Sequence, residues 1–292
     1  MSFKSVIFTK TGLQFKFFSM VLVLFSFIPI AIINAGVLVA PTVVFLYDNN
    51  RTGRITLQNT SNESMEAEVL FSYGLPVSDS LGNVEVNLND SLITDPRSAL
   101  GWVRSFPRKV IIGANNSQVV RILASPPQNL PDGEYWARIL IRSIEAQPTI
   151  PTSSEGEDIQ TQLNMVVQTA ISLKYRTGNL MSNLELSHSK ASLVNSKVRL
   201  LLDMFNRGNV SYLGVIKARL LDANNKEMSA TRLITAVYRS LRKKVMLQLP
   251  ENINEFQKPY RIEFEISTDE RSDVPPGDVV PGNSINQTVI VG

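Results

Sequence analysis

The residues that could carry out chemistry are few, because the chain of 292 residues contains one histidine and no cysteine. Without cysteine there are no disulfides, thiolate nucleophiles, iron–sulfur clusters or cysteine zinc sites. One histidine excludes a multi-histidine metal site, and a serine hydrolase would depend on His188, which stands between Ser187 and Ser189. A catalytic triad is a spatial arrangement, so neighbours in sequence are no sign of one. A surface histidine is the simpler interpretation.

Other motifs that could carry chemistry are equally weak. Glu263 and Glu265 lie two residues apart, which on a strand places both on one solvated face. No phosphate-binding loop of the form G-x-x-x-x-G-K-[ST] occurs. The run Arg239–Lys244 is the strongest basic cluster, and a solvated hairpin end is its simplest interpretation. We therefore expect a protein that is not an enzyme and that uses no metal, cofactor or small-molecule substrate.

The first 35 residues have the features of a secretory signal peptide. They contain Lys4, Lys10 and Lys16, no acidic residue, an apolar run over 17–33, and small residues at their end. The run is shorter than the ~20 residues that usually span a bilayer, which favours cleavage over an uncleaved N-terminal anchor. These lysines account for the whole formal net charge of +3, because residues 36–292 carry 26 basic and 26 acidic side chains. We expect an exported protein with no nucleic acid as partner.

Short strands separated by turns fill the rest of the sequence. Apolar and polar residues alternate, β-branched residues are frequent, and Gly, Pro, Asn and Asp bound the segments. We expect an all-β chain of two immunoglobulin-like β-sandwich domains in tandem, residues 36–178 and 179–292, after a signal peptide at 1–35.

Two further strands are expected within this pattern. A loop over 146–158 precedes Leu163–Leu173, which is the longest expected strand. The segment Leu233–Leu241 is expected to be a strand because of its β-branched residues. No segment predicts a helix of convincing length.

The order of these segments resembles that in the periplasmic chaperones of the chaperone–usher pilus pathway, the PapD-like superfamily. The resemblance covers most of residues 36–178 and rests on five stretches. Four are APTVVFLYDNNRTGRITLQNTSNE, SFPRKVIIGANNSQVVRI, LPDGEYWARILIRSI and QLNMVVQTAISLKYRTG, and the fifth, AQPTIPTSSEGED, matches only as a loop before the final strand. Residues 179–292 match only as a generic immunoglobulin-like domain. The resemblance implies two domains joined as an L, a periplasmic location, and secreted pilus or surface-protein subunits and an outer-membrane usher as partners.

The resemblance also implies a binding mechanism, in which the last strand of the first domain is lent to a subunit that lacks its own final strand. Backbone hydrogen bonds then hold the subunit while alternate apolar side chains fill its groove. The matching strand here is Leu163–Leu173, and its expected client-binding side chains are Leu163, Met165, Val167 and Ile171. The alternation alone favours packing of these side chains in the core of their own domain, and only the resemblance and the long preceding loop make client binding an equal alternative.

One feature of the family is missing. In the family, an arginine and a lysine in the cleft bind the terminal carboxylate of the subunit, but Thr42 and Ser172 occupy the two matching positions here. Neither hydroxyl can replace a cation toward a carboxylate. Lys174 lies on the same strand face as Ser172, about 6.6 Å further along. It is either a displaced carboxylate anchor or a solvated lysine.

A second family feature is present. The resemblance implies an ion pair between Glu134 and Arg176 that fixes the angle between the two domains. From the residues alone, both could be ordinary surface charges, and an exposed pair contributes about 0–1 kcal/mol.

Two functions are therefore expected. The first is a periplasmic molecular chaperone for pilus, fimbrial or other surface subunits that acts by donor-strand complementation. The alternative is a non-catalytic PapD-like structural or adaptor protein of a surface or secretion complex, without strand donation. The replaced basic pair at Thr42 and Ser172 favours the alternative. A hydrolase dependent on His188 has no positive support.

Overall fold

The computed structural model describes residues 36–88, 95–146 and 165–292. The expected signal peptide, most of the expected loop over 146–158, and Leu163 lie outside these residues. The described part of the chain contains strands, turns and three short 3-10 helices, and it contains no α-helix. The 3-10 helices are Leu100–Trp102, Ile253–Glu255 and Pro276–Asp278.

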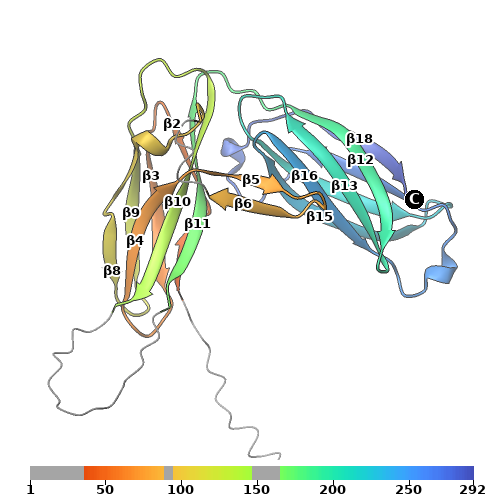
Figure 1. Ribbon diagram of the computed structural model, residues 1–292, viewed down its shortest axis with the longest axis horizontal. Coiled ribbons are helices and arrows are strands. Elements are labelled where there is room, and N and C mark those ends of the chain that lie inside the picture. The colour runs from red at the N-terminus through yellow and green to blue at the C-terminus, as the bar shows by residue number, and fades with distance from the viewer. Residues whose placement is uncertain (1–35, 89–94, 147–164) are drawn as a thin grey trace, which may run out of the picture. The chain divides into compact units, whose positions relative to one another are not determined.

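Two β-sheets pack against each other in the first part of the described chain (Figure 1). The first sheet has the order β1–β3–β9–β7, formed by Val37–Ala40, Thr52–Asn59, Ser117–Ala124 and Val103–Phe106. The second has the order β2–β11–β10–β4–β8, formed by Val43–Tyr47, Val167–Thr177, Gly133–Glu145, Met65–Ser72 and Lys109–Ile112. Strand β2 runs parallel to β11, whereas the other neighbours are antiparallel. We call this pair of sheets the first sandwich.

Alternation along the strands produces the core of the first sandwich. Ile55 and Leu57 on β3 and Ile139 and Ile141 on β10 are fully buried, because successive side chains of a strand point to opposite faces. Burying each such side chain contributes about 1.5–3 kcal/mol relative to leaving it exposed. The alternation that predicts these strands therefore also provides the free energy that holds the two sheets together.

A second pair of sheets follows and forms the second sandwich. Its three-stranded sheet has the order β12–β13–β16, formed by Leu184–Val194, Lys197–Asn206 and Ser240–Gln248. Its four-stranded sheet has the order β15–β14–β17–β18, formed by Glu227–Val237, Tyr212–Leu221, Arg261–Ser267 and Ile285–Ile290. The two sandwiches have separate cores, one drawn from residues 37–175 and the other from residues 184–266. The exact boundary at Gly178 stays a prediction.

A β-hairpin extends from the first sandwich to the second (Figure 1). It consists of β5 (Gly74–Ser78) and β6 (Val84–Leu88), and its tip lies against β16. The backbone N–H of Lys244 donates to Gly82 O at 3.1 Å, and the N–H of Arg242 donates to Ser78 Oγ at 2.9 Å. Gly82 has a φ of +78°, and a β-carbon there would lie 2.8 Å from Lys244 N. The tip therefore requires glycine at this position.

The expected fold class, all-β with two sandwiches, is confirmed. Several expected strands were placed wrongly. The strand expected over Leu163–Leu173 begins at Val167, where β11 first pairs with β10, and continues to Thr177. The segment Leu233–Leu241 is not one strand but the end of β15, a turn, and the start of β16. Strand β12 was missed, because its polar residues around His188 do not alternate clearly with apolar ones.

Candidate protein-binding site

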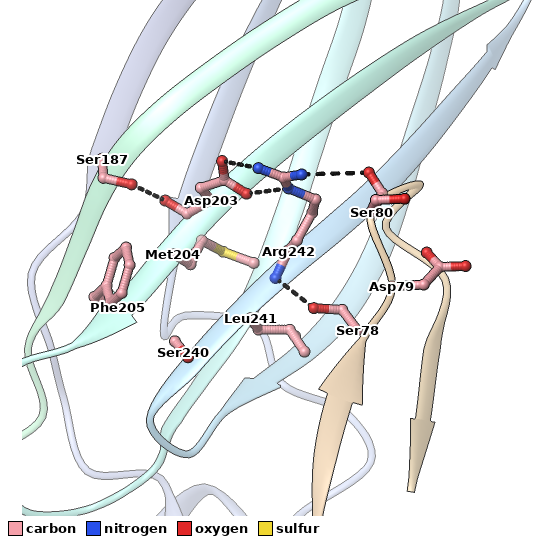
Figure 2. A pocket seen from close by; sticks show the side chains of 10 residues that line it. All are labelled: Ser78, Asp79, Ser80, Ser187, Asp203, Met204, Phe205, Ser240, Leu241 and Arg242. Atoms are coloured by element: carbon pink, nitrogen blue, oxygen red, sulfur yellow. Dashed lines mark hydrogen bonds and ion pairs between the residues drawn. The ribbon is translucent and has the colours of Figure 1, made fainter.

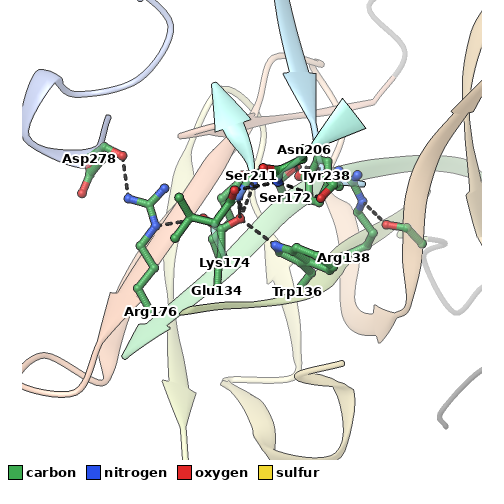
Figure 3. A network of polar contacts seen from close by, with 12 residues as sticks. Glu134, Trp136, Arg138, Ser172, Lys174, Arg176, Asn206, Ser211, Tyr238 and Asp278 are labelled. Carbon is green, nitrogen blue, oxygen red and sulfur yellow. Dashed lines mark hydrogen bonds and ion pairs between the residues drawn. The ribbon is translucent and has the colours of Figure 1, made fainter. Parts of the chain in front are cut away.

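A row of polar side chains lies on the face of β10 and β11 that points away from the core of the first sandwich (Figure 3). The antiparallel register places them in three opposite pairs, which are Glu134 with Arg176, Trp136 with Lys174, and Arg138 with Ser172. The residues between them, such as Tyr135 and Leu173, belong to the core. One face of these two strands therefore serves the core, and the other meets the second sandwich.

The carboxylate of Glu134 is the centre of this row and is completely buried. Its Oε1 accepts hydrogen bonds from Trp136 Nε1 at 2.6 Å, Lys174 Nζ at 2.8 Å and Ser211 Oγ at 2.6 Å. Its Oε2 accepts from Arg176 Nε at 2.8 Å. Ser211 belongs to the second sandwich, so one carboxylate binds donors from both sandwiches.

Burial acts to raise the pKa of Glu134, but the charges of Lys174 and Arg176 and the hydrogen bonds from Lys174 and Ser211 outweigh it. The pKa falls from 4.5 to about 2, so the carboxylate is ionised at neutral pH. Pairing and hydrogen bonding of this kind offset the cost of burying the carboxylate. Losing any one partner would leave a charge that water cannot reach.

Arg176 connects Glu134 to a second part of the chain. Its Nη1 donates to the backbone carbonyl of Asp278 at 2.6 Å, and its guanidinium lies 4.5 Å from the ring centroid of Phe45. The two residues that the resemblance pairs, Glu134 and Arg176, are in contact and buried, so they are not ordinary surface charges. That this contact fixes an angle between domains stays a prediction.

Lys174 has neither of the two roles expected from the sequence. It is buried, its Nζ contacts Glu134 and donates to Ser211 Oγ at 2.5 Å, and it lies 3.9 Å from the ring centroid of Tyr238. A lysine that already binds a buried carboxylate cannot serve as a free carboxylate anchor, and it is not solvated. The expectation fails because the register places Lys174 opposite Trp136, inside the contact between the sandwiches.

Arg138 contacts Ser172, which with Thr42 occupies the two positions that the resemblance matches to the family's basic pair. Thr42 and Ser172 are neighbours, since Ser172 N–H donates to Thr42 O at 3.1 Å. Arg138 Nη1 lies 2.5 Å from Ser172 Oγ, and its Nε donates to Gly74 O at 2.9 Å. The residue is 7% exposed. Among the described residues, no carboxylate lies within 4.0 Å of its guanidinium, so its charge lacks an acidic partner.

The ring of Tyr238 lies beside the cations Arg138 and Lys174. Its ring lies 5.6 Å from the guanidinium carbon of Arg138, and it packs edge-on against Trp136 at 5.2 Å. Burial acts to raise the pKa of Tyr238, but the charges of Lys174 and Arg138 outweigh it and lower the pKa below 10.

The edge of β11 is partly open. Strand β2 pairs with Ser172–Arg176 only, so Val167–Ile171 have no strand on that side within the described part of the chain. Met165 precedes this segment and is 58% exposed, and Val167 is half-buried. An unpaired edge with exposed apolar residues can accept another strand.

The four expected client-binding side chains therefore fall into three groups. Met165 and Val167 lie at the open edge, and Leu163 lies outside the described residues. Ile171 is a correction, because it is buried in the core of the first sandwich and faces its own domain. For Ile171, the alternative interpretation from the sequence holds.

A polar pocket of about 360 Å³ lies where the hairpin tip meets β13 and β16 (Figure 2). Both carboxylate oxygens of Asp203 accept hydrogen bonds from Arg242, at 2.6 and 2.7 Å, and hydrogen bonding from Arg242 lowers the pKa of Asp203. His188 is exposed on β12 opposite Asp203, while Ser187 Oγ donates to the Asp203 backbone carbonyl. A triad needs a carboxylate bound to histidine, and this carboxylate binds arginine.

The described residues contain neither a metal-ligand cluster nor a membrane-spanning helix. Within residues 36–88, 95–146 and 165–292, no three His, Asp or Glu side chains are grouped as a metal site would require. In the same residues, no helix has the length and apolar character needed to cross a membrane.

Sequence reasoning missed Arg138 and Ser211. Arg138 stands in the stretch ARILIRSI, where its neighbours are core residues, and only the register with Ser172 shows which way it points. Ser211 follows the turn Asn206–Asn209 and reaches Glu134 through the packing of the two sandwiches. No local signal marks either residue.

Comparison with known proteins gives structural neighbours only. No family model matches the chain, and no curated protein matches its sequence. The CupB2 chaperone of Pseudomonas aeruginosa is 11% identical over 87% of this chain and 100% of its own, with a TM-score of 0.41. The E. coli chaperone DraB is 14% identical over 78% and 88%, with a TM-score of 0.36.

A third neighbour is a chain of the Salmonella enterica SafA pilin in complex with the SafB chaperone. It is 12% identical over 87% of this chain and 96% of its own, with a TM-score of 0.39.

Proposed function

We propose that this chain is a periplasmic chaperone that binds secreted pilus or surface subunits by lending them the open edge of β11. The observation that carries this proposal is the incomplete pairing of β11. Strand β2 covers Ser172–Arg176 and leaves Val167–Ile171 without a strand on that side among the described residues, with exposed Met165 next to them. The periplasmic location rests on the expected signal peptide.

The position of β2 suggests how a client strand would lie. Because β2 runs parallel to β11 and begins at Val43, a client strand parallel to Val167–Ile171 would be in line with it. Backbone hydrogen bonds to the β11 edge would supply affinity, and Met165 and Val167 would supply apolar contacts. The end of the client strand would then reach Thr42 and Ser172.

Arg138 is the proposed anchor for a carboxylate at that end. It is almost buried, contacts Ser172, and has no acidic partner among the described residues. A charge-assisted hydrogen bond from guanidinium to carboxylate is about twice as strong as a neutral one. Arg138 thus takes the role that Thr42 and Ser172 cannot fill.

Co-expression with candidate secreted subunits tests whether the open edge of β11 binds a subunit. Met165→Asp places a charge where an apolar client contact is proposed, and it should abolish copurification of the subunit. Leu193→Asp is a matched control, because Leu193 is 55% exposed on β12 of the second sandwich. If Met165→Asp is folded and retains the subunit, the adaptor function without strand donation replaces this proposal.

The anchor is tested by the affinity for a subunit that copurifies. Arg138→Gln should weaken binding about tenfold or more, since it removes a charged hydrogen bond worth ~1.5–3 kcal/mol. Adding one glycine to the C-terminus of the subunit should weaken binding to the wild type and leave binding to Arg138→Gln unchanged. Equal losses in both proteins would show that Arg138 does not contact the carboxylate.

A further inference from the structure

The outer face of the sheet β1–β3–β9–β7 carries a second group of cations. Arg54 on β3 and Arg121 on β9 are directly opposite in the antiparallel register, and Phe106 on β7 is opposite Arg121. All three side chains are exposed. Directly opposite residues have β-carbons about 4.5–5.5 Å apart, so both guanidinium groups occupy one small patch. We call these three residues and their neighbours on the sheet the arginine face.

The arginine face has no acidic residue to balance it. None of the four strands contains Asp or Glu, and Arg104 on β7 adds a third positive charge. Among the described residues, no carboxylate lies within 4.0 Å of Arg54, Arg104 or Arg121, whereas exposed Arg51 and Arg108 have such partners. Like charges directly opposite in a sheet repel each other. An anion bound between them would remove that repulsion.

Apolar side chains surround these charges. Phe106 is 72% exposed, and Val119 and Leu123 lie on either side of Arg121 on the same face of β9. The same patch therefore offers charge and apolar surface together. Free carboxylate or phosphate would use only the charge, so the partner that fits is larger and has both kinds of group.

We propose that the arginine face binds a protein partner that presents a carboxylate side chain flanked by apolar side chains. The guanidinium fork matches a carboxylate in a two-bond arrangement. Arginine and aromatic residues are enriched and lysine is depleted in the centres of protein interfaces, and no lysine occurs in the four strands. Both the apolar side chains and the positive charge of this face therefore fit a protein partner.

A lipid surface fits less well. Basic patches that hold proteins on anionic membranes usually combine 4–8 Lys or Arg, each contributing about 1 kcal/mol. The arginine face has three. It lies on the sheet that does not contain β11, so this partner would bind without competing for the β11 edge. The inference is independent of the proposed strand donation.

A labelled peptide of alternating Asp with Leu and Phe is the probe, measured by fluorescence anisotropy with the purified full chain. The wild type should bind it, and binding should weaken as salt is raised. The double variant Arg54→Glu and Arg121→Glu should bind at least tenfold more weakly. The double variant Arg108→Glu and Arg207→Glu is the matched control, since both arginines are exposed and lie outside this sheet.

Two further measurements separate the parts of the proposal. Phe106→Ser should weaken the peptide several-fold, and a peptide of Asp with Ser in place of Leu and Phe should bind more weakly to the wild type. Equal binding of both peptides would overturn the apolar part. Equal peptide binding by the wild type and the Arg54/Arg121 variant, no binding at all, or Arg54/Arg121-dependent binding to phosphatidylglycerol vesicles without peptide binding would overturn the whole proposal.

Discussion

Two of the places where the first sandwich meets the second use charge in different ways. At Glu134 the ion pairs with Lys174 and Arg176 are buried, and every partner is fixed by packing. At the hairpin tip, Arg242 of the second sandwich hydrogen-bonds Ser78 and Ser80, and its ion pair with Asp203 of the same sandwich is 40% and 20% exposed, so water can reach both partners. A buried charge that loses its partner stays unsatisfied, whereas an exposed one is rehydrated. Removing one partner of an ion pair should therefore lower the free energy of unfolding more at Glu134 than at the pair of Arg242 and Asp203.

The largest expected effect comes from removing the centre of the buried network. Glu134→Ala should lower the free energy of unfolding by about 3–5 kcal/mol, because Lys174 and Arg176 remain buried without their carboxylate. Urea denaturation followed by tryptophan fluorescence measures this. Glu185→Ala is the control, since Glu185 forms an exposed pair with Arg207. Losses of equal size in the two variants would contradict the distinction between the regions.

The pH dependence should show the same network. The pKa of Glu134 is about 2 in the folded chain and 4.5 ordinarily, so its contribution is complete above about pH 5 and is lost as pH falls toward 2. The contribution is on the order of 3 kcal/mol. Unfolding measured from pH 7 to pH 2 should show a shallower loss of stability for Glu134→Gln than for the wild type. Parallel curves would show that Glu134 is not the titrating group.

A smaller effect is expected from the backbone of the hairpin tip. Gly82→Ala should cost about 1–3 kcal/mol, because the positive φ is strained for alanine and the new β-carbon meets Lys244 and Leu201. Thermal unfolding followed by circular dichroism gives the change in Tm. Gly101→Ala is the matched control, since a β-carbon there has nothing within 4 Å. An unchanged Tm for Gly82→Ala would mean that the tip does not dock on β16.

The smallest effect is expected at the exposed pair. Arg242→Ala should lower the free energy of unfolding by about 1 kcal/mol, the upper end for a partly solvated pair, because both Asp203 oxygens lose a hydrogen bond. Urea denaturation measures this, and adding 0.5 M NaCl should reduce the difference, because salt screens a partly exposed pair. A loss as large as that of Glu134→Ala would remove the contrast between the two regions.

Local patterns were enough to predict the fold class but not the contacts of the site. Alternation along β3 and β9 matches one buried and one exposed face, whereas β10 is buried on both faces over most of its length. The pair Glu134 and Arg176 came from the resemblance alone, because nothing local distinguishes a buried charge from an exposed one. The start of β11 was misplaced because apolar alternation continues before Val167, whereas pairing with β10 begins there.

Residues that depend on packing between distant segments could not be predicted. Arg138 turns toward the second sandwich because its opposite neighbour is Ser172, and that register depends on the whole of β10 and β11. Ser211 is 77 residues away from Glu134 in the sequence and contacts it through the association of two sandwiches. The burial of Lys174 could not be predicted either, because its partners Glu134 and Ser211 come from distant parts of the sequence.

The hydrogen bond from Ser211 to Glu134 has a consequence for how the chain loses its structure. The second sandwich provides part of the hydrogen bonding that satisfies the buried charges of the first, so the stabilities of the two are coupled. We expect the two to melt as one cooperative unit, with a single calorimetric peak whose calorimetric and van't Hoff enthalpies agree. Ser211→Ala should separate that peak into two, because it weakens the coupling and leaves both cores intact.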